Sequence, residues 1–520
     1  MAIKTYRLLN GISVALLLAA LTGCKNNEPV NTSLSRSTPE AEGISSDGLI
    51  SFLDSAAVST QELHSIMIVR HGKVVAEGWW APYGPDLRHT LYSTSKSFTS
   101  TAVGFSVTEK LLAVDNKVIS FFPDQLPDTL SPFLAEMTVR DLLTMSAGQS
   151  PDPTGTIASS DSDDWVASFL ALPVVKEPGT VFLYNSMATF MLSAIVQKVT
   201  GQKVIDYLQP RLFEPLGITG MDWEVSPKGI NTGGWGLRLK TEDMAKFGQL
   251  LLQKGIWNGI QIIPAEWIAE ATTFKIDQAP DAPPEVKEAS DWMQGYCYQF
   301  WRCRHNAFRA DGAYGQYIIV LPDKDAVVAI TAESPNMQDE INLVWNYILP
   351  AMNDEALPEK REAADRLKER LGSLALPLPE KTPDQPIARE LAGKKYIFEE
   401  NQQSFKSFSL DFRGDICILN LAIADDNFMI PLGHGAWINS ETGLSGPNII
   451  SKPGILTSNK IAAAYTWTDD YTIEATLRYI ESPHHIVMKF RFEGSNAVVN
   501  IWYSPPPGYD LPTLKATLEK

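Results

Sequence analysis

The sequence has few cysteines and no excess of basic residues. Its 520 residues include only four Cys, too few and too scattered for a disulfide scaffold in a chain of this length. Asp and Glu number 61 against 44 Lys and Arg, which gives a formal charge of −17. We therefore expect no nucleic-acid partner, because phosphate contacts need clustered positive charge. With 44% hydrophobic and 20% charged residues, the composition is that of a folded globular chain.

Long apolar runs are also missing, because no segment approaches the roughly 18 residues that a transmembrane helix needs. The apolar stretch 12–21 follows Lys4 and Arg7 and is too short to span a bilayer. It runs into Leu21-Thr22-Gly23-Cys24, which resembles the lipobox of bacterial lipoproteins. That resemblance implies a signal peptide over 1–23, lipidation of Cys24, a tether over 24–44 and a lipid-anchored protein of the bacterial cell envelope, on the periplasmic or outer-membrane face. An ordinary secretory signal that happens to contain a cysteine is the alternative.

The hydrophobic pattern predicts two further domains joined by a linker. Residues 45–353 mix a β-hairpin, two helices, a loop rich in Pro, Gly, Ser and Asp, and two apolar runs typical of central strands. These predicted segments are, in that order, 65–76, 93–110 and 187–199, 147–164, then 317–321 and 326–331. A charged helix over 355–371 and a proline-rich stretch make up the predicted linker, 354–387. Beyond it, apolar and polar residues alternate, as in Tyr471, Ile473, Ala475, Leu477 and Tyr479, so 388–520 is predicted to be an all-β barrel or sandwich.

One short motif carries the chemistry. Ser93 and Lys96 stand three residues apart at the start of an apolar helix, so both side chains face the same way. A neutral lysine amine beside a hydroxyl can take its proton, and a protonated one can stabilise the alkoxide. Burial at the helix start would lower the pKa of Lys96 and make either role feasible near neutral pH.

Four segments in this order resemble the serine β-lactamase and penicillin-binding-protein superfamily over most of residues 45–350. They are Ser93-Thr94-Ser95-Lys96, the stretch 137–148, Tyr184-Asn185-Ser186, and Gly234-Trp235-Gly236-Leu237. The pattern is most similar to class C-like esterases and 6-aminohexanoate-dimer hydrolases. The resemblance implies an α/β (α+β) fold, with an antiparallel sheet flanked by helices and a helical subdomain. It also implies catalysis without a metal or an organic cofactor.

The resemblance also implies roles for individual residues. Tyr184 would relay a proton to the leaving group, with its pKa lowered by the nearby ammonium, and Ser186 would hydrogen-bond Lys96 or substrate. The backbone amides of Ser93 and Ala313 would form the oxyanion hole, while Gly312 would let substrate lie against the backbone. Trp235 is expected to contact substrate, and Trp292, Tyr296, Tyr298 and Trp301 are candidates for an apolar acyl pocket.

The third family motif departs from its usual form, because Ala310 replaces the Lys or His that grips a substrate carboxylate. The sequence therefore favours a serine hydrolase acting on a small-molecule ester, amide or peptide-like substrate. A β-lactamase or D,D-peptidase remains an alternative, as does a non-catalytic binding lipoprotein on the same scaffold. No Gly-x-Ser-x-Gly elbow occurs, and His484-His485 lacks a His-Glu-x-x-His pattern, so neither an α/β-hydrolase nor a metal site there is expected. The sequence leaves the oligomeric state open.

Overall fold

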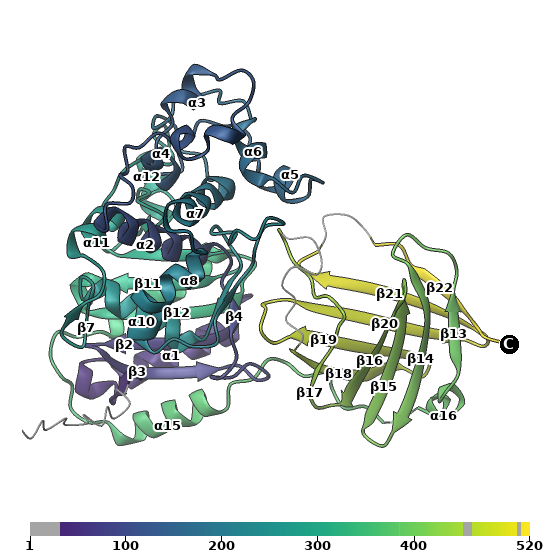
Figure 1. Cartoon of the computed structure of the whole chain (residues 1–520). Coiled ribbons are helices and arrows are strands. Elements are labelled where there is room, and N and C mark those ends of the chain that lie inside the picture. The colour runs from purple at the N-terminus through teal and green to yellow at the C-terminus, as the bar shows by residue number, and fades with distance from the viewer. Residues whose placement is uncertain (1–31, 384, 451–459, 507–510) are drawn as a thin grey trace, which may run out of the picture. The chain divides into compact units, whose positions relative to one another are not determined.

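The computed structural model describes residues 32–383, 385–450, 460–506 and 511–520, and a seven-stranded sheet forms the centre of its first domain (Figure 1). In sheet order the strands are β1 (Ser35–Arg36), β3 (Lys73–Trp79), β2 (Glu62–Arg70), β12 (Ala326–Glu333), β11 (Gln316–Leu321), β10 (Phe308–Gly312) and β9 (Trp301–Arg302). All neighbours are antiparallel except the edge pair β1 and β3. The two predicted apolar runs are the adjacent central strands β11 and β12, which confirms that prediction.

Alternate residues of the central strands feed two separate cores, one on each face of the sheet. Met67, Val69, Val327 and Ala329 pack with side chains of α2 (Ser95–Thr108), α7 (Ser186–Thr200) and α10 (Thr241–Leu252). Their neighbours Ile66, Ile68, Val328 and Ile330 pack with α1 (Ser46–Ala57) and α15 (Arg361–Gly372). Neither face of these central strands contacts solvent, which is why their sequences are continuous apolar runs.

Local signals at the chain turns behave as predicted. The hairpin of β2 and β3 turns at His71 and Gly72, whose φ angles are 49° and 74°, as a tight two-residue connection requires. Helix α7 is capped by Asn185, whose side chain accepts hydrogen bonds from the amides of Met187 and Ala188, and it ends at Gly201 with φ 72°. The predicted hairpin and both predicted helices are therefore confirmed.

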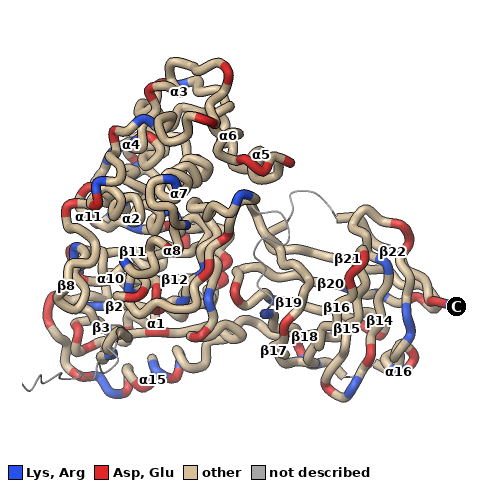
Figure 2. Tube along the Cα trace, in the orientation of Figure 1, with Lys and Arg blue, Asp and Glu red and all other residues tan. Residues whose placement is uncertain are grey.

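The charged helix begins later than predicted. We expected a start near Glu355, whereas α15 begins at Arg361, beyond Pro358. A proline disfavours helical backbone at the residue before it, so the charged stretch becomes helical only after Pro358. Figure 2 shows charges of both signs along α15, where Arg366 and Arg370 pair with Asp47 and Asp54 of α1.

Over its described residues, the C-terminal domain is a barrel of ten strands. In sheet order they are β16 (Asp426–His434), β15 (Ile416–Ile423), β14 (Phe405–Arg413), β13 (Lys395–Phe398), β22 (Leu514–Leu518), β21 (Asn496–Ser504), β20 (His485–Glu493), β19 (Thr472–Tyr479), β18 (Lys460–Asp469) and β17 (Ile438–Glu441). Pairing of β16 with β18 closes the sheet. The predicted inward residues Ile473, Ala475, Leu477 and Tyr479 are buried. Tyr471 is the exception at 58% exposure, because it lies in the turn before β19.

The predicted signal peptide and Cys24 lie outside the described residues, so they remain predictions, as do the domain limits 45–353, 354–387 and 388–520. Within the described ranges, no helix is both long and apolar enough to span a bilayer.

Candidate active site

Ser93 lies in a single 3-10 turn, η2 (Tyr92–Thr94), directly before α2. Its side chain is partly exposed, whereas those of Tyr92 and Thr94 are buried. The Thr94 hydroxyl donates to the Gln316 carbonyl at 2.7 Å, and the Ser95 hydroxyl donates to the Tyr92 carbonyl at 2.6 Å. These bonds fix the turn against β11 and leave one hydroxyl, that of Ser93, accessible.

Lys96 is buried, and its ammonium finds an acceptor for each of its three protons. Nζ lies 3.0 Å from the Ser93 Oγ, 2.9 Å from the Ser186 Oγ and 2.7 Å from the carbonyl oxygen of Gly234. Burial lowers the pKa of Lys96 to about 7, although Asp152 and Asp311 act in the opposite direction. The expected lowering of this pKa is confirmed, and both forms of the amine exist near neutral pH.

The cap of α7 positions Ser186. Asn185 accepts from the amides of Met187 and Ala188, so Ser186 is the first residue of the helix, and its own amide donates to the Thr154 hydroxyl at 3.1 Å. The predicted bond between Ser186 and Lys96 is present. The third partner, the Gly234 carbonyl, was not predicted from the sequence, because a backbone contact leaves no residue-type signal.

Tyr184 faces the same amine, with its ring centroid 4.8 Å from the Lys96 Nζ. The ring stacks on Trp301 at 5.6 Å and meets Tyr296 edge-on at 6.4 Å. Burial raises the pKa of Tyr184, and the nearby Asp311 raises it further, although a hydrogen bond to Ser93 opposes them. Our expectation of a lowered pKa is therefore wrong: desolvation outweighs the nearby amine, and the phenol keeps its proton at neutral pH.

The third motif lies where β10 ends beside the nucleophile turn. A Cβ at Gly312 would overlap the Leu91 carbonyl oxygen and approach the Thr94 Oγ1 to 3.0 Å, so Gly312 is needed for close approach of the chain to itself. The fold itself thus requires a glycine here, and the expected contact of Gly312 with substrate stays a prediction. Ala313, next in sequence, is partly exposed, and the Gln316 side chain donates to its carbonyl at 3.1 Å. Ala310 is buried at 2% exposure.

A buried ion pair that the sequence analysis missed stands in the third motif. Arg309 Nε donates to the Asp311 carboxylate at 2.8 Å, and the guanidinium lies over the rings of Trp292 and Trp301, 4.4 and 5.4 Å from their centroids. Burial raises the pKa of Asp311, although Arg309 and then Lys96 oppose that rise. Asp311 thus brings a carboxyl group close to the amine. Its place inside the third motif was the available signal.

The expected aromatic pocket divides into separate environments. Trp235 is 1% exposed and its indole donates to Glu224 at 3.0 Å, so it is a core side chain and the expected substrate contact is wrong. Tyr298 interacts with Arg140 away from this cluster. Tyr296 and Trp301 pack on Tyr184, as described above.

A family model described as Beta-lactamase matches residues 62–349, which is more than half of the chain. The chain belongs to the beta-lactamase family. As a beta-lactamase-family protein it is a hydrolase of the class that includes penicillin-binding-protein-like serine hydrolases.

Several relatives share the family domain. A 6-aminohexanoate-dimer hydrolase of Paenarthrobacter ureafaciens is 23% identical over 52% of this chain and 73% of its own length. Penicillin-binding protein 4 of Amycolatopsis lactamdurans is 26% identical over 46% of this chain and 70% of its own. Among solved structures, a putative 6-aminohexanoate-dimer hydrolase from Bacillus anthracis superposes with a TM-score of 0.52 at 21% identity, covering 63% of this chain and 89% of its own. The predicted beta-lactamase-like fold is confirmed.

Proposed function

We propose that this protein is a serine hydrolase that cleaves an ester or amide bond through an acyl-enzyme on Ser93. The observation that carries the proposal is the buried Lys96 amine, 3.0 Å from a partly exposed serine hydroxyl and with a pKa of about 7. A neutral amine at this distance can accept the hydroxyl proton at physiological pH, which most lysines cannot do.

Each neighbour has a part in the proposed reaction. Lys96 takes the proton of Ser93 as its Oγ bonds to the substrate carbonyl carbon, and the amides of Ser93 and Ala313 hold the resulting oxyanion. The phenol of Tyr184 then gives its proton to the leaving group and regains one from the Lys96 ammonium, so the C–O or C–N bond breaks without a net proton change. Attack by water on the acyl-enzyme releases the acid and restores Ser93.

Two observations favour a substrate other than a β-lactam. Ala310 is small, apolar and buried at the place where the resembling enzymes carry a Lys or His for the substrate carboxylate. The relative named 6-aminohexanoate-dimer hydrolase supports amide cleavage.

A β-lactamase or D,D-peptidase is the second candidate, since penicillin-binding protein 4 and putative D-alanyl-D-alanine carboxypeptidases are among the relatives. Rapid turnover of nitrocefin would favour it over an esterase or amidase. A binding lipoprotein without catalysis is the third candidate, and it predicts no covalent labelling of Ser93 in folded protein.

The test is acylation of Ser93. We expect p-nitrophenyl acetate to be hydrolysed and a fluorophosphonate probe to add its mass to the wild-type chain, whereas Ser93→Ala loses both activities. Ser100→Ala is the matched control, because the Ser100 hydroxyl is buried in α2, the helix that follows Ser93, and has no hydrogen-bond partner among the described residues. Full activity in Ser93→Ala would refute the assignment.

We further propose that Cys24 carries lipid and anchors the protein in the bacterial cell envelope, as the sequence motif implies. Incorporation of labelled palmitate into wild-type cells but not into cells expressing Cys24→Ala supports this. Equal labelling of both would contradict it.

A further inference from the structure

A histidine of the barrel lies directly behind the nucleophile turn. His484, between β19 and β20, is fully buried. Its Nε2 lies 2.5 Å from the hydroxyl of Tyr92, the residue that precedes Ser93, and its Nδ1 lies 2.6 Å from the carboxylate of Glu333 at the end of β12. One imidazole thus connects the end of a sheet strand with the turn that carries the nucleophile.

The protons in this chain can be assigned from the surroundings of each group. Burial works to raise the pKa of Glu333, but hydrogen bonds from His484 and His485 outweigh it and hold that pKa well below its usual range. Burial lowers the pKa of His484 despite Glu333, and burial raises that of Tyr92. A neutral His484 therefore donates a hydrogen bond from Nδ1 to the Glu333 carboxylate and accepts a hydrogen bond from the Tyr92 hydroxyl at Nε2.

His484 also contacts Tyr314, the neighbour of the second proposed oxyanion-hole residue, Ala313. Its ring meets Tyr314 edge-on at 5.1 Å, and Tyr314 directly follows Ala313. Tyr92 and Tyr314 both have positive φ angles, 44° and 63°, which a bulky side chain adopts only when its surroundings hold it there. Each strained tyrosine is the sequence neighbour of one of the two residues whose amides are proposed to bind the oxyanion.

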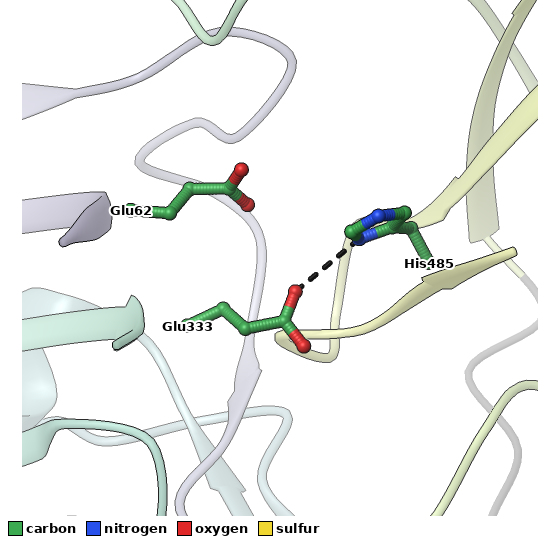
Figure 3. Close-up of side chains that lie close together, drawn as sticks. All are labelled: Glu62, Glu333 and His485. Atoms are coloured by element: carbon green, nitrogen blue, oxygen red, sulfur yellow. Dashed lines mark hydrogen bonds and ion pairs between the residues drawn. The ribbon is translucent and has the colours of Figure 1, made fainter. Parts of the chain in front are cut away.

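Glu62, Glu333 and His485 lie close enough together to be compared with a metal-binding site. Figure 3 shows Glu62, Glu333 and His485 together, with His485 bonded to Glu333 at 3.2 Å. The two oxygens of Glu62 accept from the guanidinium of Arg478 at 2.7 and 3.0 Å. A cation there would have to displace that guanidinium, so we do not propose a metal site at this cluster.

We propose that His484 is a positioning residue, supplied by the barrel, that sets the backbone of Tyr92 and Tyr314 and so the spacing of the two oxyanion-hole amides. This inference rests on the proposed function. The barrel thereby becomes part of the hydrolase site without touching the substrate. Loss of His484 should weaken binding of the transition state more than binding of the substrate.

The test compares His484→Gln with His485→Gln. Both remove an imidazole bonded to Glu333, but no contact between His485 and Tyr92 or Tyr314 is found among the described residues. With p-nitrophenyl acetate we expect kcat of His484→Gln to fall roughly 10- to 100-fold with KM nearly unchanged. Inhibition by phenylboronic acid, which mimics the tetrahedral adduct, should weaken in parallel, while His485→Gln retains wild-type values.

Tyr92→Phe keeps the ring and removes the bond to His484, so it tests the inference even if His484→Gln folds poorly. We expect a lower kcat, and a double variant no slower than the slower single variant. If the wild type hydrolyses the ester and kcat is the same in His484→Gln, this inference alone is overturned. Additive losses of kcat in the double variant would overturn it as well. Absence of turnover and of Ser93 labelling in the wild type would overturn the proposed function as well.

Discussion

Lys96 has a hydrogen-bond acceptor for each of its three ammonium protons, and yet its pKa is lowered. Three acceptors surround Nζ, yet all three are neutral oxygens, so none compensates the loss of hydration as a carboxylate in direct contact would. The carboxyl groups that favour the ammonium, Asp152 and Asp311, act from a distance. The result is a pKa of about 7, and the charge of this one residue should govern activity near neutral pH.

The pH dependence gives a first prediction. Because neutral Lys96 is the proposed base, kcat/KM should rise with pH through about 7 and fall as the amine is protonated below it. Asp152→Asn removes an exposed acid that raises the pKa of Lys96, so the midpoint should move to lower pH, by less than about one unit because solvent screens the charge. Asp163→Asn, an exposed change of equal charge in the same loop, is the control in a pH–rate series. Equal midpoints in the two variants would contradict the prediction.

Residue-level predictions from the sequence succeeded where a side chain carries the contact. The bonds of Lys96 to Ser93 and Ser186 follow from motif and spacing. The Gly234 carbonyl was missed because any residue offers one, and the pKa of Tyr184 was wrong because burial cannot be weighed against a neighbouring charge without coordinates.

At the scale of elements, periodicity predicted β2, β3, α7, β11 and β12 because each has a single pattern and a clear end signal. The errors concern positions where one residue breaks the pattern, such as the late start of α15 beyond Pro358 and the exposed Tyr471. The close approach of β10 to the nucleophile turn joins segments more than 200 residues apart, so no local pattern predicted it and only the family resemblance, which pairs the amides of Ser93 and Ala313, indicated it.

That approach gives a second prediction. Gly312→Ala should lower both the free energy of unfolding, by roughly 1–3 kcal/mol, and kcat, since the new methyl group must push the Leu91 carbonyl and with it the turn of Ser93. Denaturant titration and ester hydrolysis measure the two effects. Gly155→Ala, in α5 (Thr154–Ala158) with nothing within 4 Å of the added carbon, should be neutral or slightly stabilising. Equal behaviour of the two variants would rule out the close approach.

At the scale of the whole molecule, an ion pair between buried Arg478 and partly exposed Glu62 joins the hydrolase sheet to the barrel. Arg478 of β19 is 6% exposed and holds Glu62 of β2 with two bonds. Truncating one partner of such a pair leaves the other charge uncompensated.

The third prediction follows. Arg478→Met should lower the free energy of unfolding by roughly 1.5–3 kcal/mol, because Glu62 loses two charge-assisted hydrogen bonds but keeps partial access to solvent. Lys406→Ala, which breaks the exposed pair with Asp425, should change it by less than about 1 kcal/mol. Urea unfolding followed by fluorescence measures both, and a loss at Arg478 no larger than that at Lys406 would show that the pair does not couple the two domains.

The bond between Tyr92 and His484 joins positions 392 residues apart. At synthesis rates of roughly 5–20 residues per second, a ribosome needs roughly 20–80 s to pass from the first residue to the second. During that interval the segment that bears Ser93 already exists while its distant partner does not. The bond between Tyr92 and His484 can therefore form only after residue 484 has been synthesised.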